Sequence, residues 1–172
     1  MLRPPMEAKD KRRNGDGKSR SKLLGTSSRR LSTRGLSFEE VNQWSQSLAR
    51  LLESPYGMIT FQAFLKAEFS DENLEFWLVC EDYKKVKRSF RLSAKARKIF
   101  NCFIRVDAPR EINIDHQTRE LTKRNLQAPT TACFMEAQKT VFGLMEKDSY
   151  PRFLRSSIYK NLMDSRSESF KM

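Results

Sequence analysis

Apolar residues recur at helical spacing through most of the chain. After Leu36 they occupy Val41, Trp44, Leu48 and Leu51, three or four positions apart, which is the period of one helix face. The same spacing recurs six times further along, and no segment alternates convincingly in the manner of a β-strand. The pattern therefore predicts an all-α protein. The expected helices are 38–53, 58–68, 71–87, 94–106, 118–126, 131–147 and 151–163.

Small polar residues mark where these helices are expected to begin. Ser37 followed by Glu40 has the form of a capping box, in which each side chain binds the backbone N–H of the other residue. Leu36 and Val41 are placed for a hydrophobic staple around the same turn. Further expected N-caps are Ser70, Ser93 and Thr130 or Thr131.

The third expected helix, 71–87, is apolar most of the way round in its first half. A helix of this kind belongs in the middle of a bundle. Its expected partners in the core are Phe61, Phe64, Leu65, Ile99, Phe100, Phe103, Phe134, Val141, Phe142 and Leu144. Short connections favour antiparallel neighbours, so the sequence predicts an antiparallel bundle of about seven to nine helices.

Three of the links between these helices are polar. If the helices alternate in direction, the links after the second, fourth and sixth helices lie at the same end of the bundle. They carry the polar stretches 68–73, 109–120 and 146–152. We therefore expect three polar loops to meet on one surface.

The first stretch, EFSDENLEFW from residue 68 to residue 77, holds four carboxylates in a chain whose formal net charge is +12. Two interpretations are open. Ser70 as an N-cap, with Asp71 and Glu72 in the first turn, would place acid at the positive end of a helix and would need no function. Alternatively, a partner protein binds these groups from outside.

Positive charge is concentrated at the start of the chain. Residues 1–35 hold 11 Lys and Arg against 3 Asp and Glu, and they contain no Phe, Tyr or Trp. Such a segment buries too little apolar surface to offset the entropy of ordering it. We expect a disordered basic tail over 1–35, one domain over 36–163 and a short C-terminal tail over 164–172.

Catalytic and metal chemistry finds little support in the sequence. His116 is the only histidine, and Cys80, Cys102 and Cys133 lie on or beside apolar helical faces, as buried thiols do. These four residues could form a Cys-His pair or a Cys3His zinc site. Their spacing, however, matches neither paired zinc ligands nor a disulfide framework. No phosphate-binding glycine loop occurs. We expect no active site, no cofactor and no bound metal.

The basic tail bears on location and partners. No apolar run approaches the roughly 20 residues that span a bilayer, and the first residues lack the apolar core of a secretory signal, so a cytoplasmic protein is expected. Without aromatic residues to stack on bases, the tail does not indicate nucleic-acid binding. Peripheral attachment to the anionic inner face of the plasma membrane fits better, the alternative being a solvated leader. Ser32 follows Arg29 and Arg30 in a pattern that basophilic kinases favour, and is a candidate phosphosite.

Three separated motifs, EFSDENLEFWLVCEDYKK, NIDHQTRE and LMEKDSYPRFL, closely resemble those of the regulators of G-protein signalling, the RGS domains. The resemblance covers roughly residues 38–163 and points to the small members of the family. It implies a helical bundle that binds the switch regions of a Gα subunit and accelerates GTP hydrolysis, which terminates receptor signalling. Gα of the Gi class is the first expected partner and the Gq class the second, and a monomer is expected. The alternative is a scaffold that binds Gα without accelerating hydrolysis.

The same resemblance implies which residues contact Gα. They are Glu68, Phe69, Glu72 and Asn73 in the first stretch, Asn113, Asp115 and His116 in the second, and Leu144, Asp148, Ser149 and Arg152 in the third. Asn113, an uncharged amide that both donates and accepts, suits contact with the glutamine that orients water in Gα. A role as a turn residue is the alternative for Asn113. Arg152 follows Asp148 by four positions and is expected to brace the third stretch as well.

Overall fold

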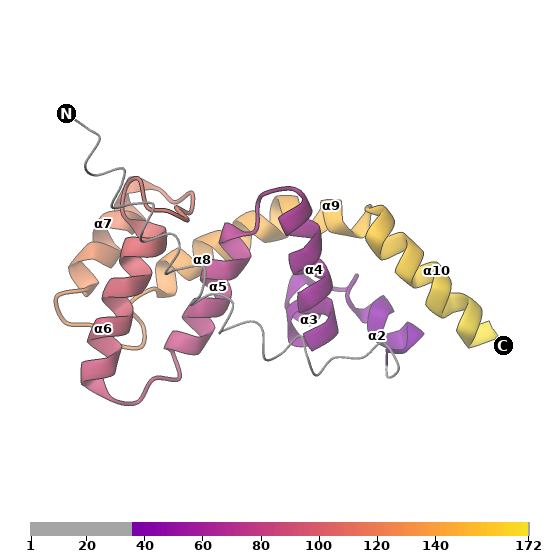
Figure 1. The fold of residues 1–172 in the computed structure, drawn as a ribbon, viewed down its shortest axis with the longest axis horizontal. Helices are drawn as coiled ribbons and strands as arrows, with labels where there is room; N and C mark the ends of the chain where they lie inside the picture. Colours follow the sequence, from indigo (N-terminus) through magenta and orange to yellow (C-terminus); the bar gives the residue numbers. More distant parts are fainter. Residues whose placement is uncertain (1–35, 172) are drawn as a thin grey trace. The chain divides into compact units, whose positions relative to one another are not determined.

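The computed structural model of this chain describes residues 36–171 (Figure 1). Within this range the secondary structure consists of helices joined by short links, so the predicted all-α fold is confirmed. The expectations for the basic tail and for Ser32 concern residues outside this range. No helix within residues 36–171 is both long enough and apolar enough to cross a membrane.

The described residues form two compact units, each of which has its own helices. The central unit runs from Asp71 to Met145, and the terminal unit combines residues 36–70 with residues 146–171. The central unit contains α5 (Glu72–Tyr83), α6 (Ser89–Ile99), the π-helix η2 (Phe100–Ile104), α7 (His116–Asn125) and α8 (Met135–Leu144). The terminal unit contains α2 (Phe38–Gln43), α3 (Leu48–Glu53), α4 (Pro55–Ala67), α9 (Tyr150–Leu154) and α10 (Ser157–Lys171). A second π-helix, η3 (Met145–Ser149), leads from α8 to α9.

The core of the central unit is built around α5, as its apolar character predicts. Phe76 of α5 packs against Phe103 and Phe134 with ring centroids 5.4 and 6.2 Å apart, and Tyr83 packs edge-on against Phe134 at 5.1 Å. Such tilted and edge-on contacts are the favoured geometries of aromatic pairs. The Tyr83 hydroxyl donates to the carbonyl oxygen of Thr130 at 2.7 Å. The same side chains therefore bury apolar area and fix the chain that precedes α8.

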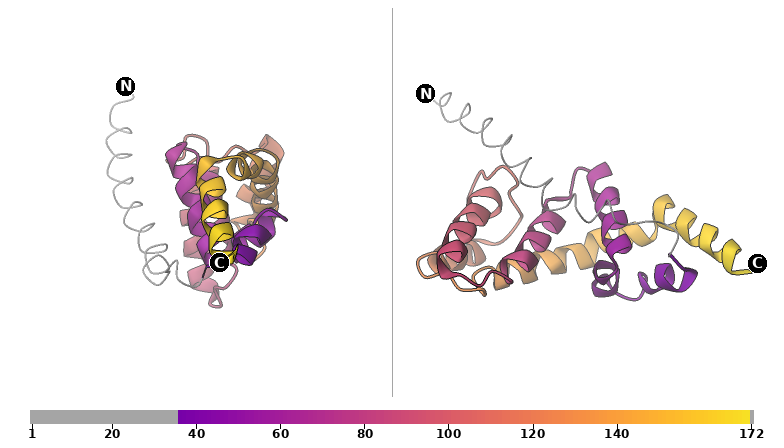
Figure 2. Two further views of the ribbon diagram at one scale, coloured as in Figure 1. Left: turned by 90° about the vertical axis from the view of Figure 1, so that its right-hand side faces the viewer. Right: turned by 60° about the horizontal axis from the view of Figure 1, so that its bottom comes forward.

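The terminal unit closes through contacts between its first and last helices. The Tyr159 hydroxyl in α10 donates to the Val41 carbonyl oxygen in α2 at 3.0 Å, and the Tyr150 hydroxyl donates to the Trp44 carbonyl oxygen at 2.6 Å. Figure 2 shows α10 alongside α2. Phe153 packs edge-on against Phe61 with centroids 5.4 Å apart. Two buried phenols thus bridge more than a hundred residues of sequence, and the edge-on contact between Phe61 and Phe153 joins the same parts of the chain.

The predicted helix 38–53 is wrong, because the chain forms α2 and α3 with a break between them. Ser47 is extended and its hydroxyl accepts the Arg50 N–H at 3.1 Å, which starts α3. The apolar spacing continues across the break, so periodicity does not reveal it. The capping box forms only in part: the Ser37 hydroxyl accepts the Glu40 N–H at 3.1 Å, whereas the Glu40 carboxylate accepts the Ser54 hydroxyl at 2.7 Å.

Two other expected caps are also wrong. Ser93 lies inside α6, which begins at Ser89 because Leu92 already belongs to its buried face. The Thr130 hydroxyl accepts the Ala132 N–H at 3.2 Å and so caps a turn before α8 rather than the helix itself. At the end of the chain, α10 continues to Lys171, past the expected end at 163.

The third polar stretch, 146–152, is helical rather than a loop. The chain widens into η3 after α8 and continues directly into α9. Pro151 lies in the first turn of α9, where its missing N–H breaks no helical hydrogen bond. Polarity and a proline suggested a link here, but neither prevents a helix from starting.

Gly57 and Gly143 offer a matched test of this packing. A Cβ at Gly57 would lie 2.6 Å from the Leu51 carbonyl oxygen and 3.0 Å from the Trp44 ring, whereas a Cβ at Gly143 meets nothing within 4 Å. We expect Gly57→Ala to lose about 1 to 3 kcal/mol of unfolding free energy through overpacking. Gly143→Ala should gain about 0.5 to 1 kcal/mol, because alanine is the better helix former. Urea denaturation of both variants measures this, and a stabilised Gly57→Ala would contradict the close approach.

Candidate functional site

Residues Glu68 to Ser70 end α4 in a left-handed turn. The Ser70 N–H donates to the Leu65 carbonyl oxygen at 2.9 Å and the Phe69 N–H donates to that of Lys66 at 3.1 Å. This pair of bonds is the Schellman motif, in which the residue after the C-cap has positive φ. Glycine is the usual residue there, but in this chain it is Phe69, with φ 55°.

Phe69 combines backbone strain with exposure. A non-glycine residue in the left-handed region costs roughly 1 to 2 kcal/mol, a cost that glycine at the same position would avoid. Its ring gains nothing from the interior in return, because the residue is 93% exposed. Strain of this kind concentrates at binding sites. Phe69 is therefore the clearest candidate contact in the terminal unit.

Arg152 holds two of the predicted contact residues together in the terminal unit. Its guanidinium donates to both carboxylate oxygens of Asp148, at 3.3 and 3.1 Å, and also pairs with Glu68. The same group lies over the Phe64 ring, 5.9 Å from its centroid. The hydrogen bond from Arg152 lowers the pKa of Asp148 below its usual value. The predicted brace between Arg152 and Asp148 is thus confirmed, and it extends to the end of α4.

The start of α5 differs from the prediction. The N-cap is Asp71 rather than Ser70, and its side chain makes no capping bond. The Ser70 hydroxyl is buried without a hydrogen-bond partner among the described residues. The prediction that Ser70 caps the helix is therefore wrong. Its N–H already closes the preceding turn, and this sets Ser70 before the helix rather than at its cap.

The carboxylates of Asp71 and Glu75 are bound to a residue that the sequence did not single out. Arg110, in the link between η2 and α7, donates from Nε to Glu75 at 2.7 Å and from Nη2 to Asp71 at 2.9 Å. Asp71 is 7% exposed and Glu75 is 5% exposed. Burial alone lowers the pKa of the Arg110 guanidinium, but its bonds to Glu75 and Asp71 outweigh burial and raise that pKa. No local pattern marks this pairing, because 35 or more residues separate Arg110 from its partners.

Glu72 and Asn73, between those two carboxylates in the sequence, are left unpaired. Neither side chain has a hydrogen-bond or ion-pair partner in the range 36–171, and the Asn73 amide oxygen is buried without one. Buried polar atoms are normally satisfied, so an orphaned amide oxygen requires explanation.

The link from η2 to α7 is anchored on the open end of the π-helix. The Arg110 N–H donates to the Cys102 carbonyl oxygen and the Ile112 N–H to that of Phe103, both at 2.9 Å. Ile112 and Ile114 are buried, and Asn113 between them is exposed. Asn113 lies in neither a helix nor a turn, and its side chain has no partner among the described residues. The alternative role of Asn113 as a turn residue therefore finds no support.

Asp115 begins α7. Its carboxylate accepts the Thr118 N–H at 3.0 Å and the Thr118 hydroxyl at 2.6 Å, and this hydroxyl bond is the main reason that the pKa of Asp115 is lowered. His116 follows as the first helical residue and is exposed. Asp115 thus has a structural role that needs no partner, while the imidazole of His116 is accessible to one.

The predicted contacts of the third stretch differ in how exposed they are. Leu144 ends α8 as an exposed apolar residue, and Asp148 is exposed beside Arg152. Ser149 is only 8% exposed and so offers a partner little surface. Within the central unit, Arg110 joins the segments that carry Asn73 and Asn113, and Arg152 joins Glu68 to Asp148 in the terminal unit. The convergence of all three stretches on one surface stays a prediction.

The thiols of Cys80 and Cys133 do not resemble catalytic groups. Burial raises the pKa of Cys133 to about 11 and raises that of Cys80 well above its ordinary value. A reactive cysteine needs a lowered pKa, because the thiolate is the nucleophile. Both are therefore thiols of the core.

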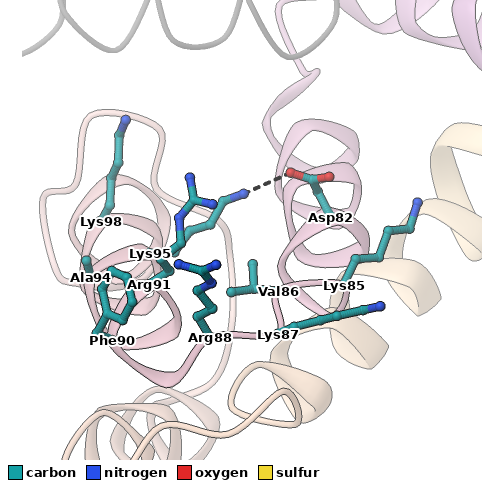
Figure 3. Close-up of a pocket in the computed structure, with 10 residues that line it drawn as sticks. All are labelled: Asp82, Lys85, Val86, Lys87, Arg88, Phe90, Arg91, Ala94, Lys95 and Lys98. Atoms are coloured by element: carbon teal, nitrogen blue, oxygen red, sulfur yellow. Dashed lines mark hydrogen bonds and ion pairs between the residues drawn. The ribbon is translucent and has the colours of Figure 1, made fainter.

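A basic hollow of about 710 Å³ lies beside the end of α5 and the start of α6 (Figure 3). Six of its ten lining residues are Lys or Arg, and one of them, Lys95, forms an ion pair with Asp82 at 2.9 Å. None of the residues predicted to contact Gα lines it. Asp82 lies near the end of α5, whereas Glu72 and Asn73 lie at its start.

Comparison with known proteins identifies the family. The model of the Regulator of G protein signaling domain matches residues 47–162. The chain belongs to the regulator of G-protein signalling (RGS) family. Regulator of G-protein signaling 8 of Homo sapiens is 56% identical over 128 residues, which is 74% of this chain and 71% of that protein. Regulator of G-protein signaling 1 of Equus caballus is 56% identical over 137 residues, 79% of this chain and 69% of that protein. Regulator of G-protein signaling 5 of Rattus norvegicus is 53% identical over 128 residues, 74% and 71% respectively.

The RGS match spans every residue predicted to contact Gα, from Glu68 to Arg152. It begins at Ser47, the residue that starts α3, and so omits α2. In this chain α2 nevertheless packs against α10 through the bond from Tyr159 to Val41. The terminal unit therefore extends beyond both ends of the matched range.

Ser47 and Ser70 allow a hydroxyl that caps a helix to be compared with a hydroxyl that has no partner among the described residues. The Ser47 hydroxyl accepts a backbone N–H at the start of α3, and the Ser70 hydroxyl accepts none. We expect Ser47→Ala to lose about 0.5 to 2 kcal/mol of unfolding free energy. Ser70→Ala should change it by less than about 0.5 kcal/mol, since no bond is lost. Equal losses in urea titrations would show that the Ser70 hydroxyl has a partner in solution.

Proposed function

We propose that this RGS protein accelerates GTP hydrolysis by heterotrimeric Gα subunits through residues of both units. The family match over residues 47–162, which includes all three predicted contact stretches, is the observation that carries this proposal. In the central unit the proposed contacts are Glu72, Asn73, Asn113, Asp115, His116 and Leu144. In the terminal unit they are Glu68, Phe69, Asp148, Ser149 and Arg152.

The proposed mechanism needs no catalytic group from this chain. Gα carries its own arginine and a glutamine that orients the attacking water. A protein that binds the transition-state arrangement of these groups better than the ground state lowers the barrier by the difference in binding energy. This function requires a rigid surface with free polar groups. The exposed amide of Asn113 supplies such a group, and the arginine clusters supply the rigidity.

Asn113 is proposed to contact the water-orienting glutamine of Gα. Its neighbours Ile112 and Ile114 are buried, so the backbone on either side is fixed while the amide faces outward. An amide donates and accepts at once, which matches a glutamine side chain without adding charge.

The finer assignments rest on the resemblance and on charge. The Gi class is the first candidate partner and the Gq class the second, with a monomeric activator. A scaffold that binds Gα without accelerating hydrolysis is the competing function. Peripheral attachment of a cytoplasmic protein to anionic membrane is proposed from the basic charge of residues 1–35.

Single-turnover GTP hydrolysis by purified Gαi and Gαq tests the function. The chain should raise the hydrolysis rate of at least one of them, and binding without acceleration would support the scaffold instead. Asn113→Ala should weaken binding to Gα carrying GDP and aluminium fluoride by at least tenfold, about 1.4 kcal/mol. Binding to Gα carrying a slowly hydrolysed GTP analogue should change much less. Gln117→Ala, which removes an exposed amide four positions further along the chain, is the matched control.

Phe69 allows binding and stability to be separated. Phe69→Gly removes both the ring and the left-handed strain, so it should raise the unfolding free energy by up to about 1 kcal/mol while weakening Gα binding. Phe69→Ala removes the ring and keeps the strain, so it should weaken binding without the gain in stability. Calorimetric titration against Gα and urea denaturation measure the two effects. Unchanged affinity in both variants would remove Phe69 from the contact surface.

A further inference from the structure

Arg110 is not among the residues expected to contact Gα, yet it joins two of the segments that carry them. Its Nε and Nη2 atoms donate to Glu75 and Asp71 at 2.7 and 2.9 Å, and its backbone N–H donates to the Cys102 carbonyl oxygen at 2.9 Å. One residue is thereby bound to the start of α5 and to the end of η2. Asn113 follows it by three positions.

We propose that Arg110 is a positioning residue for GTPase activation, which fixes Asn73 on α5 relative to Asn113 in the following link. The inference rests on the proposed function, because it says how the two amides are held for Gα. Arg110 acts through them and need not touch Gα itself.

The geometry gives Arg110 this control. Asp71 and Glu75 are one helical turn apart. A guanidinium that binds both therefore fixes the orientation of the first turn of α5, and not only the distance from that turn to the link that carries Arg110. Glu72 and Asn73 lie within that turn. On the other side, the buried side chain of Ile112 ties the link to the core between Arg110 and Asn113. A misplacement of about 1 Å in such an arrangement is enough to cost a hundredfold in rate.

Arginine suits this position for a specific reason. Its planar group donates several hydrogen bonds in fixed directions, whereas a lysine ammonium is a point charge that satisfies one carboxylate well at a time. Arg110→Lys should therefore keep the fold and the charge but loosen the orientation. Arg110→Gln removes the charge that pairs with both buried carboxylates.

The experiment measures transition-state preference rather than activity alone. For each variant, affinity is measured for Gα with GDP and aluminium fluoride and for Gα with a slowly hydrolysed GTP analogue, at a temperature where circular dichroism shows the variant folded. The affinity for the aluminium fluoride form divided by the affinity for the GTP-analogue form should fall at least tenfold in Arg110→Gln. The same ratio for Arg110→Lys should lie between that of Arg110→Gln and that of the unaltered protein. Lys95→Gln, which breaks the ion pair with Asp82 in the same unit, should leave the ratio unchanged.

A double variant tests whether Arg110 acts through Asn113. If it does, adding Arg110→Gln to Asn113→Ala should lower the affinity ratio by a factor at least threefold smaller than Arg110→Gln does in the unaltered protein. The reason is that the positioned group is already absent. Fully additive effects would overturn the inference, as would an unchanged affinity ratio in folded Arg110→Gln. If Arg110→Gln does not fold, Arg110→Lys decides: a ratio equal to that of the unaltered protein overturns the inference. Failure of the unaltered protein to accelerate any Gα would refute the proposed function instead.

Discussion

Two buried carboxylates that share one cation set the geometry of the central unit. Asp71 and Glu75 lie inside the unit, where an unpaired charge is strongly unfavourable, and Arg110 pairs with both. Because Arg110 also binds the open end of η2 through its backbone, the link that carries Asn113 has little freedom of its own. The partly irregular segment 105–115 is thus held by charges at the start of a different helix as well as by its own backbone bonds to η2.

The terminal unit uses the same chemistry in a more exposed setting. Arg152 binds Asp148 with two hydrogen bonds and pairs with Glu68, while its guanidinium lies over the Phe64 ring. Exposed ion pairs contribute little to stability, so this cluster is better understood as holding a shape than as holding the fold. It keeps the end of α4, and with it the strained turn at Phe69, in register with η3 and α9.

Helical periodicity predicted the fold class and the central place of α5, but not the breaks between helices. The pattern runs on from Trp44 to Leu48 across the start of α3, because a cap such as Ser47 interrupts the backbone and not the apolar face. Motif resemblance supplied the candidate site, and the brace by Arg152 was predictable because its partner Asp148 lies one helical turn away. Arg110 was missed, since nothing local connects it to carboxylates far away in the sequence.

Under the proposed function the acid in EFSDENLEFW has two purposes, which helix geometry keeps apart. Residues four positions apart share a helix face, so Asp71 and Glu75 point together to Arg110. Glu72 and Asn73 fall at other angles around the same turn and remain without partners in the described part of the chain. In the proposed function rigidity and recognition come from adjacent residues, so a partner that binds Glu72 and Asn73 would meet groups whose backbone is already fixed. Little conformational entropy is then lost on binding, and more of the contact energy remains to distinguish one state of the partner from another.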